Sequence, residues 1–180
     1  MKNLFIINGS ASDGSSNQRL IDNIADRLKD DFNITVFNQL KNLPHFDPQL
    51  SDSNPPAAIR EFRKQIDEAH AVLICTPEYV FSIPSGLKNA IEWCVSTVVF
   101  SDKPLGIITA SAHGQRGHEE LQLIMRTVTA KFNEDTAWLI QGIKGKISEE
   151  GVITHEGTRH EMTKFIASFK QLVFSTTAGE

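Results

Sequence analysis

A loop rich in hydroxyl and amide side chains lies close to the amino terminus. Residues 9–17 read Gly-Ser-Ala-Ser-Asp-Gly-Ser-Ser-Asn and separate an apolar run at 3–8 from a helical stripe that starts at Leu20. The N-terminus of a helix presents unpaired N–H groups and a partial positive charge, so this arrangement can bind a phosphate. Residues 9–18 contain no lysine or arginine and match neither the dinucleotide-binding nor the triphosphate-binding glycine pattern. They predict a phosphate site built from neutral donors, unless the loop serves only to cap the helix.

A second candidate loop, Thr-Pro-Glu-Tyr-Val-Phe-Ser-Ile at 76–83, follows an apolar run that we expect to be a buried strand. Apolar residues then recur at helical spacing as far as Val98, which predicts a helix from near Pro84 with Ser82 as its N-cap. A third loop, at 111–117, again separates an apolar strand from a helical stripe. Ligands of open parallel sheets bind at the carboxyl ends of the strands, so the three loops are predicted to form one site.

These loops resemble the signature of the NAD(P)H-dependent FMN reductase family, which has a flavodoxin-like fold and includes quinone, azo-dye and chromate reductases. The match runs through Thr-Pro-Glu-Tyr at 76–79, Ser-Ile-Pro at 82–84 and Leu-Lys-Asn-Ala-Ile-Glu-Trp at 87–93. The family's first loop, Gly-Ser-x-Arg-x-x-Ser-x-Asn, is similar to residues 9–17, and its Ser-Gly-Gly loop matches 111–113 in position.

The resemblance implies that the chain binds FMN and takes electrons from NADPH or NADH, with the flavin and no catalytic side chain carrying the reaction. The implied FMN-binding residues come from all three loops. They are Ser10, Ser12, Ser15, Ser16 and Asn17 for the phosphate, Pro77, Glu78, Tyr79 and Val80 along the ring, and Ser111, Ala112, His113 and Gly114 on its far side. Glu78 and Tyr79 have an alternative interpretation as loop packing and subunit contacts, and His113 is either a hydrogen-bond donor to flavin or substrate or a solvent-exposed loop residue.

The chain departs from the family's usual residues inside these loops. Ser12 stands where arginine is usual, Val80 where asparagine is usual, and Ser85 and the pair Ala112-His113 where glycines are usual. The loss of an arginine and of an asparagine side chain removes polar contacts, so we expect FMN to be held less tightly than in the family.

The remaining apolar patterns predict a strand–helix series. Strands are expected at 3–8, 33–37, 71–75, 103–110 and 135–140, each followed by a helical stripe. Prolines exclude regular structure over most of 38–56, where His45, Phe46 and Asp47 are interpreted as loop packing, with Phe46 able to approach the site. The series predicts an α/β fold, a flavodoxin-like three-layer α/β/α sandwich with a five-stranded parallel sheet of order 2-1-3-4-5. Residues 176–180 are expected to fray.

Length and composition limit the other possibilities. A chain of 180 residues with 40% hydrophobic content suits one domain, 1–180, and a net charge of −4 without a basic cluster argues against nucleic acid or an anionic membrane as partner. Cys75 and Cys94 are expected to be buried, and His113, His118 and Glu119 lack the spacing of a zinc motif, so no metal is expected. No secretory or membrane-spanning pattern is present, so a cytoplasmic location is expected.

Three functions fit a sheet of this type. A phosphoacceptor domain is set aside because the chain lacks the acidic pair after its first strand and the aspartate after its third. A flavodoxin-type electron carrier stays open as the alternative, although such carriers are usually more acidic. The favoured function is an NAD(P)H-dependent FMN or quinone reductase with a ping-pong mechanism, passing electrons to a quinone, free flavin, azo dye or metal oxyanion. The resemblance also implies a homodimer or homotetramer with the site near a subunit boundary.

Overall fold

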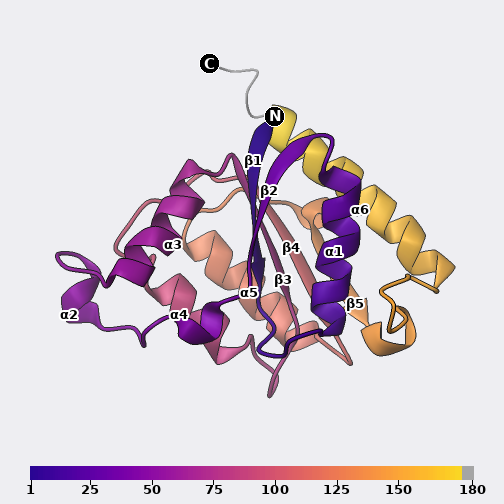
Figure 1. Cartoon of the computed structure of the whole chain (residues 1–180), viewed down its shortest axis with the longest axis horizontal. Coiled ribbons are helices and arrows are strands. Elements are labelled where there is room, and N and C mark those ends of the chain that lie inside the picture. Colours follow the sequence, from indigo (N-terminus) through magenta and orange to yellow (C-terminus); the bar gives the residue numbers. More distant parts are fainter. Residues whose placement is uncertain (176–180) are drawn as a thin grey trace.

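Five parallel strands form the centre of the structure, a computed structural model that describes residues 1–175 (Figure 1). Their bounds are β1 Lys2–Asn8, β2 Phe32–Phe37, β3 Ala71–Thr76, β4 Leu105–Ser111 and β5 Ala137–Gln141. The strand order is β2-β1-β3-β4-β5, which confirms the predicted order. Every residue of β3 is buried, whereas β2 at the edge is only partly buried. The predicted burial of the strand at 71–75 is therefore correct.

Helices cover both faces of the sheet (Figure 1). Their bounds are α1 Ser16–Leu28, α2 Pro48–Ser51, α3 Ala57–Glu68, α4 Ser85–Glu92, α5 Gln115–Thr127 and α6 Glu156–Ser175. Leu4 and Ile6 of β1 pack with α1 and α6, while Phe5 and Ile7 pack with α3, α4 and α5. Successive side chains of a strand point to opposite faces, so β1 contributes to both cores.

Short helical turns occupy the connections. They are η1 Leu40–Asn42, η2 Glu134–Thr136 and η3 Ile143–Gly145. The proline-containing connection 38–56 holds only η1 and α2, as expected. Both free cysteines, Cys75 and Cys94, are buried, as expected. Within residues 1–175, no helix is both long and apolar enough to span a bilayer.

The helix after Pro84 is shorter than its apolar pattern predicted. It ends at Glu92, and Val95 and Val98 are 64% and 78% exposed. Arg63 Nε donates to the Trp93 carbonyl oxygen at 2.8 Å, which satisfies a carbonyl at this helix end. The apolar spacing therefore continues past the helix into a segment of turns.

Two other expectations concern chain ends. Ser82 is not the N-cap of α4, because Pro84 holds that position without a side-chain hydrogen bond. The predicted fraying of 176–180 falls outside the described residues.

Candidate functional site

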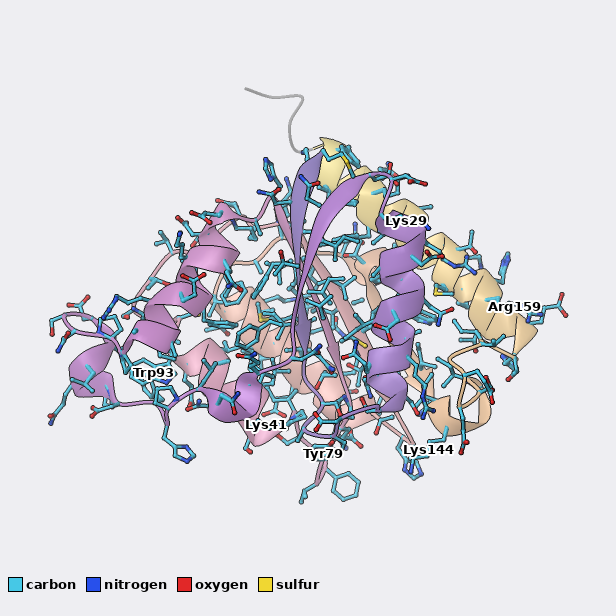
Figure 2. The ribbon with its side chains drawn as sticks, in the orientation of Figure 1. Lys29, Lys41, Tyr79, Trp93, Lys144 and Arg159 are labelled. Carbon is cyan, nitrogen blue, oxygen red and sulfur yellow. The ribbon has the colours of Figure 1, made fainter. Side chains whose placement is uncertain are left out.

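A cavity of about 790 Å³ opens at the carboxyl edge of the sheet, where the loops after β1, β3, β4 and β5 meet. We call it the central cavity; Figure 2 labels Tyr79 and Lys144 from its lining, at the lower edge of the molecule. It brings together most of the residues implied by the resemblance. These are Ser10, Ser12, Ser15, Ser16, Asn17, Pro77, Glu78, Tyr79, Ser111 and Ala112. Val80, His113 and Gly114 do not line it.

The first turn of α1 offers hydrogen-bond donors to this cavity. Ser15 is the N-cap, and its Oγ accepts the Gln18 N–H at 3.2 Å. Among residues 1–175, the N–H groups of Ser16 and Asn17 have no protein acceptor. Unpaired N–H groups at a helix N-terminus favour an anion, so this end of the cavity can bind a phosphate.

The carboxamide of Asn8, at the end of β1, fixes the loop that follows it. Asn8 Oδ1 accepts the Ser10 N–H at 3.0 Å, and Ser10 Oγ accepts the Ser12 N–H at 3.3 Å. Asn8 Nδ2 donates to Gln18 Oε1 at 2.9 Å and to Asn38 Oδ1 at 3.0 Å. Asn8 is buried, so these bonds hold the loop against both α1 and the segment after β2.

The Asn17 side chain ties α1 to the two central strands. Its Nδ2 donates to the Ala110 carbonyl oxygen at 3.1 Å, and its Oδ1 accepts the Cys75 thiol at 3.4 Å. Burial raises the pKa of the Cys75 thiol far above its usual range, so the thiol stays a neutral donor. The contacts of Asn17 show that its backbone N–H, more than its side chain, is free for a ligand.

Two carboxylates join the β3–α4 loop to α5. Glu78 Oε1 accepts the Gly114 N–H at 3.2 Å and its Oε2 accepts the Gly117 N–H at 2.8 Å, both at the N-terminus of α5. In the opposite direction, from α5 to the β3–α4 loop, Glu120 Oε2 accepts two hydrogen bonds. The donors are the Ser82 hydroxyl at 2.6 Å and the Ile83 N–H at 3.0 Å. Glu78 therefore joins two of the loops that form the central cavity. The sequence did not reveal this role, because the hydrogen-bond partners of Glu78 lie more than 30 residues away along the chain.

The tip of the β3–α4 loop is a strained turn. Tyr79 and Ser82 pair through both backbone groups, at 2.9 and 3.1 Å, and the two residues between them have positive φ. Val80 has φ +53° and Phe81 has φ +60°, and they are 94% and 76% exposed. A β-branched side chain is disfavoured in this left-handed region, whereas asparagine tolerates it, so the departure at Val80 costs backbone strain.

Positive charge reaches the cavity from outside the first loop. Arg19, one turn into α1, and Lys144 of η3 both line it. Arg19 Nη1 donates to the Ser148 carbonyl oxygen at 3.4 Å, and exposed Lys144 has no protein partner among the described residues. The cavity lining thus adds two cations, beside the acidic Glu149, to the neutral donors predicted from residues 9–18. The sequence interpretation of residues 9–18 did not include the loop after β5. That loop also lies at the carboxyl edge of the sheet.

The β4–α5 loop contributes Ser111 and Ala112 to the cavity, while His113 is exposed and its functional role stays a prediction. Gly114 is the left-handed N-cap of α5, with φ +85°. His118, which the sequence left without a role, is buried and bonded to the Thr109 hydroxyl at 2.9 Å. Its burial lowers its pKa, so it is neutral and structural at physiological pH.

Comparison with known proteins agrees with this geometry. The model of the NADPH-dependent FMN reductase family matches residues 1–144, a stretch that includes the loops after β1, β3 and β4 and reaches η3. The chain belongs to this family. The predicted resemblance is thus confirmed.

Individual relatives of this FMN reductase family member are also reductases. The NADH-dependent flavin reductase subunit 2 of Lactobacillus johnsonii is 35% identical over 133 residues, which cover 71% of this chain and 69% of that protein. The 2-hydroxy-1,4-benzoquinone reductase of a Burkholderia species is 30% identical over 171 residues, covering 91% and 92%. Among solved structures, the flavoenzyme NAD(P)H:acceptor oxidoreductase FerB of Paracoccus denitrificans shares the fold, with a TM-score of 0.82 at 22% identity and coverage of 97% and 98%.

Proposed function

We propose that this protein is an FMN-dependent oxidoreductase that takes electrons from NAD(P)H and passes them by a ping-pong mechanism to a small acceptor. The acceptor class comprises quinones, free flavins, azo dyes and metal oxyanions. The family match over residues 1–144 carries the proposal. The NADH-dependent flavin reductase and the benzoquinone reductase among its relatives favour an enzyme over a flavodoxin-type carrier.

The lining of the central cavity fits FMN. Its volume, about 790 Å³, lies within the ordinary range of cofactor pockets. Unpaired N–H groups at the start of α1, serine hydroxyls and the two cations Arg19 and Lys144 suit a phosphate. When bound, FMN supplies the redox chemistry, accepting a hydride from the nicotinamide and giving up electrons to the acceptor.

The side chains and backbone of this chain would then bind and orient. We assign the phosphate to Ser10, Ser12, Ser15 and Ser16, with Arg19 and Lys144 supplying the charge that Ser12 lacks. We assign the ring to Pro77, Tyr79, Ser111 and Ala112 at the other end of the cavity. Glu78 is assigned a positioning role, because its carboxylate holds the loops that carry these residues.

We also propose a homodimer or homotetramer that works in the cytoplasm. The exposed apolar side chains Val95, Val98 and Leu123, on α5 and on the segment after α4, support self-association. Light scattering coupled to gel filtration measures the oligomer size.

Turnover tests the proposed function. Protein reconstituted with FMN is expected to oxidise NADH or NADPH rapidly once a benzoquinone is added, with parallel lines in double-reciprocal plots because the mechanism is ping-pong. Matched control reactions lack either the protein or the quinone. FMN binding without any NAD(P)H oxidation would contradict the proposal and support the electron carrier.

A further inference from the structure

A second cavity, of about 520 Å³, lies beside the central cavity. Its wall combines the loop after β1, the segment after β2 and the first turn of α4. The lining residues used below are Ser12, Asp13, Lys41, His45, Tyr79 and Ser85. It extends away from β4 and β5 toward η1, and most of its lining lies outside the residues implied for FMN.

The two cavities share part of their walls. Ser10, Ser12, Gly14 and Tyr79 line both of them. Figure 2 shows Tyr79 between Lys41 of the second cavity and Lys144 of the central cavity, along the lower edge of the molecule. A ligand with one end in the central cavity can therefore extend past Tyr79 into the second cavity.

The second cavity is suited to an anion. It presents the Lys41 ammonium and the His45 imidazole as donors, and Asp13 is the one acidic residue of its lining within residues 1–175. Lys41 and Asp13 form an ion pair at 3.4 Å, but their side chains are 56% and 92% exposed. An exposed pair of this kind contributes little, so Lys41 can exchange Asp13 for a phosphate at small cost. The first turn of α4, at Ser85 and Gly86, adds backbone N–H groups without an intrahelical acceptor.

The segment that carries His45 is held firmly in place. The Pro44 carbonyl oxygen accepts Trp93 Nε1 at 2.8 Å and Asn89 Nδ2 at 3.0 Å, and Asn89 Oδ1 accepts the Phe46 N–H at 2.7 Å. The Phe46 ring packs edge-on against the buried Trp93. These contacts anchor the chain on both sides of His45 to α4. His45 was interpreted from sequence as loop packing, yet it is exposed and lines the cavity.

We propose that the second cavity binds the ADP-ribose half of the nicotinamide dinucleotide, with Lys41 pairing with its phosphates. This inference rests on the proposed function, in which the nicotinamide must reach a flavin in the central cavity. The dinucleotide then spans both cavities across Tyr79. A small neutral quinone needs no cation and would use the central cavity alone. A diphosphate would pair with Lys41 and would pass the wall that the two cavities share.

Calorimetric titration of ADP-ribose into FMN-loaded protein tests the proposal without turnover. Lys41→Ala is expected to weaken ADP-ribose about tenfold, the effect of one charge-assisted contact, and Lys41→Glu to weaken it further. Lys88→Ala is the matched control, because Lys88 lies on α4 in an ion pair with Glu92 and does not line the cavity. It removes the same charge and should change the affinity less than about twofold.

Steady-state kinetics give a second readout. Lys41→Ala should raise KM for NAD(P)H about tenfold while kcat and KM for a benzoquinone stay unchanged, since Lys41 contacts only the remote half of the donor. Equal ADP-ribose affinity in Lys41→Ala and Lys88→Ala, or no ADP-ribose binding to the wild type at millimolar concentration, would overturn the inference. If the wild type binds ADP-ribose through Lys41 but oxidises no NAD(P)H, the proposed function fails while this site stands.

Discussion

Gly9→Ala should lower the free energy of unfolding by about 3 kcal/mol, the upper range for overpacking a closed site. A Cβ at this position would lie 2.3 Å from Thr76 Oγ1 and 3.1 Å from Thr76 Cα. Thr76 is fully buried, and the Gly9 N–H donates to the Cys75 carbonyl oxygen at 2.8 Å, so neither strand can move aside without losing a hydrogen bond. Urea denaturation measures the loss.

The same substitution should weaken FMN at least about tenfold, because displacement of residue 9 also moves Ser10 at the start of the phosphate loop. Gly145→Ala is the matched control. Gly145 also lines the central cavity, but a Cβ there meets nothing within 4 Å. It should leave stability and FMN affinity close to the wild type. If Gly9→Ala is as stable as the wild type, the backbone at residue 9 does not lie as close to Thr76 as these distances indicate.

Glu78→Ala should destabilise the protein by about 2–3 kcal/mol, since it removes a charged acceptor shared by two backbone N–H groups. Those groups, from Gly114 and Gly117, begin α5 and would be left without their acceptor. The β3–α4 and β4–α5 loops would also separate, so FMN and riboflavin should both bind more weakly. Thermal and urea unfolding with flavin titrations measure these effects.

The control for Glu78→Ala is a glutamate on the surface of α5. The side chain of Glu119 bonds to the exposed Gln115 and pairs with the exposed Arg116, so Glu119→Ala should leave stability and flavin affinity close to the wild type. If Glu78→Ala behaves like this control, the carboxylate does not hold the two loops together, and the positioning role fails.

The sheet and its loops were predictable because they depend on local patterns. The apolar runs indicated where the strands lie in the sequence. Right-handed crossovers allow few strand orders in a parallel sheet, so the order β2-β1-β3-β4-β5 could be predicted. Continuing apolar spacing, in contrast, did not reveal that α4 ends at Glu92. Residues in turns after a helix can keep the same spacing while Val95 and Val98 point to solvent.

The contacts that complete the site were not predictable because they join distant segments. The Glu78 carboxylate binds α5, the Asn17 side chain binds β3 and β4, and Lys144 comes from the far end of the sheet edge. Sequence reasoning assigned Glu78 to the ligand from the resemblance, and it assigned Asn17 to the phosphate as one of the neutral donors of residues 9–17. No local pattern distinguishes a side chain that contacts a ligand from one that holds the loop beside it.

The most direct test compares FMN with riboflavin, which lacks the phosphate, in the wild type and in Ser10→Ala. A hydrogen bond to a charged group contributes about 1.5–3 kcal/mol, so Ser10→Ala should weaken FMN roughly 10- to 100-fold and leave riboflavin almost unchanged. Quenching of flavin fluorescence gives the four dissociation constants. Equal weakening of both ligands, or a wild type that binds no FMN at tens of micromolar, would contradict a phosphate held by the loop after β1.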